Sequence, residues 1–298
     1  MPRLQCGDSH LDKVVIEGLP DAYIMSNPVL ERILFNRNLI GLDFSDACQE
    51  ASEAFVEHFS AEISSFGDDV AELVILTKGI YYWLHNAFAA RLRRNLEANF
   101  IVTKRSTVSG TSVSIDVPYC DFSAPVHNLI LADTIASGAT MVAALRHYSG
   151  FHALRRVLVF SMAGTATGGR ALAAFCQERE VELTIVYGLA AFGLGSNGFD
   201  LSFLHPDTIC PNQDYVRRAR DMYEGKPVSA VGWDFGSQAQ AVRKYRMLCW
   251  IEAEYWGLQH SDLFRLKERV TDRRLVEKEM SAYADRVQLG DGAAPETQ

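Results

Sequence analysis

Residues 128–141 read NLILADTIASGATM, and this stretch decides the fold. It opens with a short apolar run, meets an acidic residue at Asp133 and continues through small residues into a second apolar pattern. An apolar run without polar alternation is typical of a strand buried in a parallel sheet. The small residues then predict a tight turn, and the periodicity from about Ala139 to Tyr148 predicts a helix.

The same alternation of short apolar runs and helical patterns continues on both sides of this stretch. Buried strands are expected at residues 73–76, 100–102, 129–131, 157–160 and 183–186, and helices from about residue 29 and at 43–63, 81–96, 139–148 and 171–178. Apolar strands separated by helices indicate a parallel sheet that is covered on both faces. The fold class is therefore predicted to be α/β, with a central parallel sheet flanked by helices.

Composition and charge exclude several classes of function. The chain has 298 residues, a formal net charge of -8 and 48% hydrophobic residues, which suits a globular protein with a full core. No basic field is present to attract nucleic acid. Six scattered cysteines form no C-x-x-C pair and are interpreted as reduced thiols. Without an apolar leader or a long apolar run, the sequence predicts a soluble cytoplasmic protein with no membrane partner.

The residue types after the strand suit an anionic ligand. Small residues let the backbone approach a ligand closely, and the start of the next helix presents N–H groups to a phosphate. Ser137 and Thr140 add hydroxyl donors, and Asp133 could accept hydrogen bonds from sugar hydroxyls. Its position at the carboxyl end of a strand is where ligands bind in open α/β sheets.

Residues 128–141 resemble the signature of type I phosphoribosyltransferases, in which an apolar strand and acidic residues precede a small-residue turn that holds a 5′-phosphate. Ala132 stands where the family usually has its first acidic residue, and Ala139 where a second glycine is common. The resemblance implies a fold with a hood over the sheet, phosphoribosyl pyrophosphate (PRPP) as donor, and Mg²⁺ as cofactor, held directly or indirectly at Asp133. The implied PRPP-binding residues in this loop are Asp133, Thr134, Ala136, Ser137, Gly138, Ala139 and Thr140.

Two further segments extend the resemblance. Residues 76–80 follow the first sheet strand, where the family has a pyrophosphate loop and many relatives have a cis peptide bond; Lys78 and Gly79 are the implied contacts. Lys104 and Arg105 lead into the Ser-, Thr- and Gly-rich connection 106–124, where the family has a mobile hood or flap. Together with Asp133, this basic pair is the expected catalytic set, which stabilises the departing pyrophosphate.

Within the superfamily the chain is most similar to uracil phosphoribosyltransferases. The run 27–30 and a degraded signature at 234–238 carry this resemblance, which covers about residues 25 to 240. The signature has changed too far for the uracil pocket to be carried over. An altered pocket is expected to take a nucleobase-like acceptor or a specialised acceptor of secondary metabolism. Its predicted residues are Phe192, Asn197, Asp200, Trp233 and Asp234.

Other interpretations stay open at this stage. Residues 166–169 (ATGG) look like a phosphate loop but lack an acidic residue, and residues 193–198 fit the dinucleotide pattern G-x-G-x-x-G without a long helix after it. A non-catalytic or regulatory PRPP- or nucleotide-binding protein of the same fold is the alternative function. No histidine spacing supports a metal hydrolase.

Three parts of the chain are expected from these patterns. Residues 1–68 form an N-terminal helical segment, residues 69–236 the phosphoribosyltransferase core with its hood, and residues 237–298 a helical C-terminal extension with a tail. Apolar residues in the extension favour a homodimer.

Overall fold

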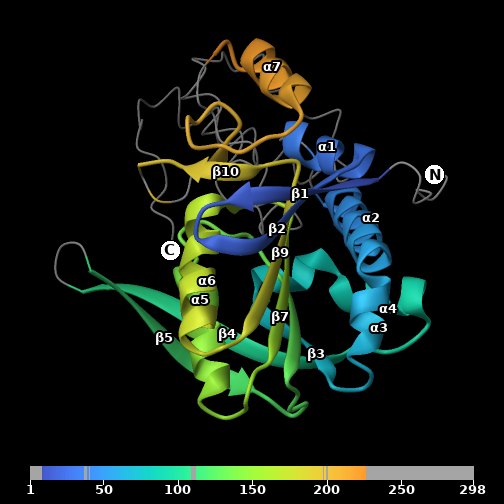
Figure 1. Ribbon diagram of the computed structural model, residues 1–298, viewed down its shortest axis with the longest axis vertical. Helices are drawn as coiled ribbons and strands as arrows, with labels where there is room; N and C mark the ends of the chain where they lie inside the picture. Colours follow the sequence, from blue (N-terminus) through green and yellow to red (C-terminus); the bar gives the residue numbers. More distant parts are fainter. Residues whose placement is uncertain are drawn as a thin grey trace, which may run out of the picture.

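The computed structural model describes residues 9–36, 39, 41–108, 112–196, 198 and 201–225. One large sheet forms the middle of the protein, with helices on both faces (Figure 1). Its strands, in chain order, are β1 (His10–Ile16), β2 (Leu19–Ser26), β3 (Val70–Leu76), β4 (Glu97–Val108), β5 (Ser112–Asp121), β6 (Asn128–Ala132), β7 (Arg156–Ser161) and β9 (Glu182–Gly188).

The order across this sheet is β1-β2-β9-β7-β6-β3-β4-β5. The strands from β2 to β4 are parallel to their neighbours, and β1 and β5 pair antiparallel at the two edges. The predicted α/β class with a central, mostly parallel sheet is confirmed. The predicted extension 237–298 lies outside the described residues, and the division of the chain into three parts stays a prediction.

The described helices are α1 (Pro28–Phe35), α2 (Leu42–His58), α3 (Ser60–Ser65), the 3-10 turn η2 (Lys78–Tyr82), α4 (Leu84–Leu92), α5 (Ala139–Ser149), α6 (Ala166–Glu178) and α7 (Gln213–Met222). The apolar periodicity predicts α1, α4, α5 and α6 with different ends and joins α2 and α3 into one helix, whereas it does not predict α7. None of the described helices is both long and apolar enough to cross a bilayer.

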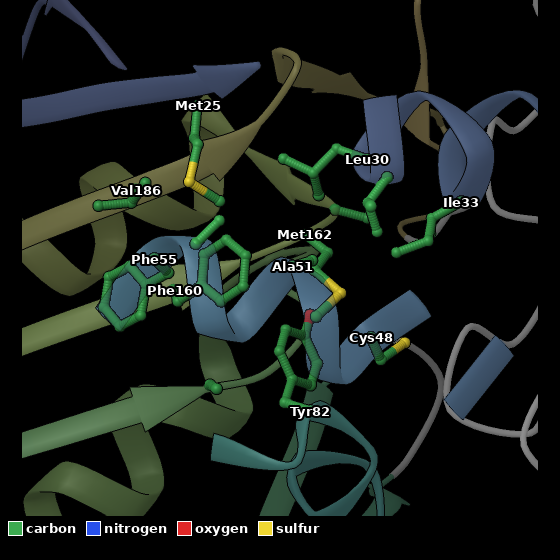
Figure 2. Packing of buried hydrophobic residues seen from close by; sticks show 14 of the residues in the cluster. Met25, Leu30, Ile33, Cys48, Ala51, Phe55, Tyr82, Phe160, Met162 and Val186 are labelled. Carbon is green, nitrogen blue, oxygen red and sulfur yellow. The ribbon is translucent and has the colours of Figure 1, made fainter. Parts of the chain in front are cut away.

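Side chains alternate across β6 and bury both faces of the sheet. Leu129 and Leu131 enter the core on the side of α5 and α6, whereas Ile130 and Ala132 enter the core on the side of α1, α2 and α4. On the second side, the ring of Phe55 in α2 stacks on Phe160 of β7, with centroids 4.8 Å apart (Figure 2). Burial on both faces explains why this strand reads as a continuous apolar run.

Four segments differ from the sequence prediction. Residues 10–26, which carry no clear periodicity, form the hairpin β1–β2 at the sheet edge, with Gly18 at φ 77 in the turn. The expected connection 106–124 is instead mostly a hairpin of β4 and β5, whose β-branched residues favour strands. The helix expected over 81–96 shortens to α4, because Trp83 and Arg93 take left-handed backbone angles.

The fourth difference is the region after residue 188, expected to be loop-rich. In its described part it contains β10 (Ala191–Leu194), β11 (Leu201–Ser202) and α7. With β8 (Gly164–Thr165), these strands form a second sheet in the order β11-β10-β8. α1, β10 and α7 lie beyond the end of the large sheet where the parallel strands finish (Figure 1).

Candidate functional site

The topology of the parallel strands locates the site. After β2, the parallel strands follow one another along the chain as β3, β4, β6, β7 and β9, but across the sheet they run β4-β3-β6-β7-β9, so the order reverses between β3 and β6. In open α/β sheets, ligands bind outside the carboxyl ends of the strands at this reversal. The two segments that leave those ends are the 76–79 segment and the 133–140 loop, both singled out in the sequence.

The 133–140 loop carries Asp133 directly after β6. Asp133 is 6% exposed, and its Oδ1 accepts a hydrogen bond from its neighbour's backbone, the N–H of Thr134, at 2.7 Å. Ser137, Ala139 and Thr140 are partly exposed. One buried carboxylate therefore stands at the start of the loop, and partly exposed residues with hydroxyl groups, Ser137 and Thr140, stand at its end.

Helix α5 begins at this loop without a side-chain cap. Its N-cap residue is Gly138, at φ 76, and no side chain bonds to the first N–H groups of the helix. Uncapped N–H groups and the positive end of the helix dipole together favour an anion at this position. Glycine suits this position because it adopts the left-handed turn and because a Cβ here would lie 2.5 Å from the carbonyl oxygen of Gly168.

Helix α6 provides the contrast. The hydroxyl of Thr165 accepts the N–H of Gly168 at 2.8 Å, so the first turn of α6 is capped by its own chain. The glycines of the 166–169 string are buried, and a Cβ on Gly169 would lie 2.0 Å from the hydroxyl of Tyr187. This string is a packing element and the sequence interpretation of it as a phosphate loop is not supported.

The dinucleotide-like pattern at 193–198 also lacks its helix. Gly193 belongs to β10, and β11 follows at Leu201. The ring of His205 covers Gly193, where a Cβ would lie 2.0 Å from His205 Nδ1. This glycine therefore makes room for a side chain rather than for a pyrophosphate.

The 133–140 loop is braced from below by β8 and α6. The N–H of Ile135 donates to the carbonyl of Ala163 at 3.2 Å, and the N–H of Thr165 donates to the carbonyl of Ile135 at 2.9 Å. The Thr165 hydroxyl donates to the carbonyl of Ala136. These bonds fix the loop backbone at Ile135 and Ala136, and a fixed backbone is a condition for a preorganised anion site.

The 76–79 segment lies beside this loop. The Leu76–Thr77 peptide bond is cis, as the family resemblance implies, and Thr77 and Lys78 are exposed. A Cβ on Gly79 would lie 3.2 Å from the carbonyl oxygen of Ala132, so a glycine here lets the two segments approach closely. Ala132, at the position of the family's first acidic residue, is 3% exposed and packs in the core.

The β4–β5 hairpin brings a basic residue to the loop. The Nε of Arg105 donates to the hydroxyl of Thr140 at 3.3 Å. Lys104 is also exposed, but adjacent residues of a strand point to opposite faces. The structure therefore brings Arg105 to the 133–140 loop and directs Lys104 away from Arg105.

Of the five predicted acceptor residues, the structure describes Phe192. Phe192 is fully buried, and its ring packs against Phe203 with centroids 4.9 Å apart. Asn197, Asp200, Trp233 and Asp234 lie outside the described residues. The acceptor pocket therefore stays a prediction.

Sequence reasoning missed two residues beneath the site. Thr165 caps α6 and holds Ala136, and a threonine before a helix start was the available signal. Tyr82 follows the 76–79 segment and is fully buried in the core (Figure 2). Burial raises the pKa of Tyr82 well above its usual value, and the negative charge of Asp133 adds to this. No sequence pattern marks Tyr82 as close to Asp133.

A magnesium ion fits this site only in part. Among the described residues, no three His, Cys, Asp or Glu side chains gather where they could hold a metal. Asp133 offers a single carboxylate beside the uncapped helix. Mg²⁺ commonly binds through one or two carboxylates together with substrate phosphates. The residues fit an ion that is held mainly by a phosphorylated substrate.

Comparison with solved structures finds partial likenesses. The AQ2163 protein from Aquifex aeolicus is 16% identical, with 59% of this chain and 95% of that chain covered at a TM-score of 0.42. Adenine phosphoribosyl transferase from Trypanosoma brucei is 13% identical, with 63% of this chain and 90% of that chain covered at a TM-score of 0.39. Orotate phosphoribosyltransferase from Aeropyrum pernix is 15% identical, with 46% of this chain and 72% of that chain covered at a TM-score of 0.29. Neither protein-family models nor curated protein sequences match the chain. Because these TM-scores are low, the assignment of function rests on the site.

Proposed function

We propose that this protein is a PRPP-dependent phosphoribosyltransferase that joins the phosphoribosyl group to a nucleobase-like or specialised small-molecule acceptor. One observation carries the proposal. Helix α5 starts without a side-chain cap six residues after Asp133, at the strand reversal where α/β sheets bind ligands. The signature in residues 128–141 adds the expectation that the anion is a sugar 5′-phosphate.

In the proposed reaction, the 133–140 loop and the 76–79 segment bind different parts of the donor. The 5′-phosphate lies against the backbone N–H groups near Gly138 and the hydroxyls of Ser137 and Thr140. Asp133 accepts hydrogen bonds from the ribose hydroxyls, and Lys78 lies beside the pyrophosphate. Magnesium, when bound, neutralises charge on the pyrophosphate as it leaves. The protein's own residues orient the donor and exclude water.

The chemical step forms one bond and breaks one. A nitrogen or oxygen of the acceptor attacks C1′ of the ribose, the bond from C1′ to the pyrophosphate oxygen breaks, and pyrophosphate leaves with the electron pair. The acceptor loses its proton to solvent. Positive charge develops on the ribose ring, and the carboxylate of Asp133 is the charge best placed to stabilise it.

Pyrophosphate release tests the proposal directly. Protein, PRPP and Mg²⁺ are incubated with uracil, with other nucleobases and with amino sugars, and pyrophosphate is measured. Release that depends on one acceptor is the expected result, and efficient turnover of uracil would contradict a specialised acceptor. If PRPP does not bind in a calorimetric titration, the proposed function is wrong.

A second candidate is a non-catalytic PRPP or nucleotide sensor. Its support is Ala132, which leaves the donor site with one carboxylate where the family has two. Tight PRPP binding without turnover across the acceptor panel would favour this candidate. Cytoplasmic localisation and a homodimer stay predictions.

A further inference from the structure

The Arg105–Thr140 contact joins two parts of the chain that are 35 residues apart in sequence. Arg105 lies in the outer half of β4, opposite Ile115 of β5, and Thr140 lies in the first turn of α5. A register shift between Val102 and Lys104 precedes Arg105 in the hairpin. Such irregularities re-aim the side chains that follow them, and here Arg105 reaches the 133–140 loop.

The charge of the loop indicates a role for the Arg105 guanidinium in binding a phosphate. Between Asp133 and Leu145 the chain contains one carboxylate and no basic residue. A phosphate monoester that binds there brings up to two negative charges next to Asp133. Backbone N–H groups alone compensate only partly, and a guanidinium at the rim of the loop would supply a full opposite charge.

The geometry of the contact leaves both partners able to bind the same anion. Arg105 uses its Nε–H toward Thr140, and a guanidinium carries four further N–H donors on its two terminal nitrogens. Thr140 accepts through its hydroxyl oxygen and can still donate its own O–H. A phosphate oxygen that accepts from Thr140 therefore lies within reach of the Arg105 fork, which suits bidentate phosphate recognition.

We propose that Arg105 is a ligand of the donor's 5′-phosphate, so that a phosphate in the 133–140 loop also holds the β4–β5 hairpin over the site. This inference rests on the proposed function. It differs from the role expected from the sequence, in which Lys104 and Arg105 together act on pyrophosphate. Adjacent strand residues face opposite sides, so the two cannot clamp one group from the same face of the hairpin.

Binding of the two halves of the donor, measured separately, tests this assignment. The affinities of the full chain for ribose 5-phosphate and for magnesium pyrophosphate are measured by titration calorimetry in the wild type, Arg105→Gln, Arg105→Lys and Arg146→Gln. Arg146 is an exposed arginine in the last turn of α5, so its variant has the same change in net charge away from the loop. Thermal melting checks that each variant is folded.

The expected result is selective. Arg105→Gln should weaken ribose 5-phosphate binding about tenfold or more, which is the scale of one charge-assisted hydrogen bond, and change pyrophosphate binding less than about twofold. Arg105→Lys should recover part of the loss, and Arg146→Gln should bind both ligands like the wild type.

Three outcomes would overturn the inference in distinguishable ways. If Arg105→Gln weakens pyrophosphate binding alone, Arg105 belongs to the pyrophosphate half. If neither affinity changes, Arg105 serves only the hairpin. If the wild type binds neither ribose 5-phosphate nor PRPP, the proposed function fails and the inference fails with it.

Discussion

Gly138 and Gly168 meet backbone to backbone beneath the 133–140 loop. A Cβ on Gly138 would lie 2.5 Å from the carbonyl oxygen of Gly168, and a Cβ on Gly168 would lie 2.4 Å from the carbonyl oxygen of Ala136. Gly138 also has φ 76, which favours glycine. The position of the loop therefore depends on two residues without side chains, only one of which belongs to the loop.

Substituting Gly138 should damage both stability and phosphate binding. In Gly138→Ala, the left-handed backbone and the overlap with Gly168 are expected to lower the free energy of unfolding by about 2–4 kcal/mol. Urea titration measures this loss, and ribose 5-phosphate affinity should fall at least about tenfold, since the loop must shift. Gly67→Ala is the control: Gly67 has φ 61 but open space around it, so about 1 kcal/mol is expected.

Gly168→Ala tests the steric overlap between the two glycines without the left-handed backbone angle of Gly138. Gly168 makes the same contact from α6, outside the loop. Weaker ribose 5-phosphate binding is expected, because the added methyl group pushes on Ala136. Unchanged affinity in both Gly138→Ala and Gly168→Ala would mean that the phosphate binds elsewhere.

Asp133 should be needed for transfer and not for folding. Its carboxylate accepts a hydrogen bond from the N–H of Thr134, and an asparagine oxygen can accept the same bond. Asp133→Asn and Asp133→Ala are therefore expected to keep the fold, as seen by circular dichroism, and to lower kcat/KM at least about a hundredfold, since ribose orientation and charge stabilisation are both lost. Normal pyrophosphate release by either variant would contradict this role.

Lys78 should act on the pyrophosphate half of the donor. Lys78 is exposed in η2, and one residue, Thr77, separates it from Leu76 at the cis peptide bond. Lys78→Gln is expected to weaken magnesium pyrophosphate binding about tenfold and to leave the melting temperature within about 2 °C of the wild type. Ribose 5-phosphate affinity is the internal control, and an equal loss for both ligands would argue against a pyrophosphate contact.

Glu72 should make stability depend on pH. It is 1% exposed on β3, and Oε2 of its carboxyl lies 3.8 Å from Nδ1 of His85. Burial raises the pKa of Glu72 to about 8 and lowers the pKa of His85. The folded protein thus keeps a proton on Glu72 that the unfolded chain releases near pH 4.5.

The sign of the effect follows from proton binding. Between about pH 4.5 and 8 the folded state binds more protons, so the stabilising contribution of the neutral carboxyl is lost as the pH rises through 8. The free energy of unfolding should fall by a contribution on the order of 4 kcal/mol between pH 4.5 and 9 in the wild type. In Glu72→Gln this contribution should be absent. Parallel pH profiles for the two proteins, measured by urea titration, would show that Glu72 is ionised in the fold.

The sequence predicts the central β6–α5 unit well, because a buried parallel strand, a small-residue turn and an amphipathic helix each have a strong local pattern. The β1–β2 hairpin has no such pattern: its strands lie at the sheet edge, where polar residues such as Lys13 and Asp21 are tolerated and pair with each other. Residues 92 and 96 keep helical spacing, yet Leu96 lies beyond the end of α4.

Contacts across the site are harder to predict. The sequence marks Arg105 and Thr140 separately, but their pairing depends on a register shift in the hairpin, which no local pattern encodes. Likewise, the Gly168-Gly169 pair resembles part of a phosphate loop in the sequence. Two adjacent glycines allow close approach either of a phosphate or of a neighbouring backbone, so the pattern alone does not distinguish the two. Only the arrangement of α5 and α6 distinguishes these uses.

The short strand β8 pairs on one side with the 133–140 loop and on the other side with strand β10. Gly164 bridges to Ile135 in the 133–140 loop and also pairs with Ala191 of β10. A rearrangement of residues 191–202 that tilts β10 would pull on this shared strand. Under the proposed function, a change of acceptor specificity made in this region would also alter phosphate binding unless the pairing at residues 164–165 is kept.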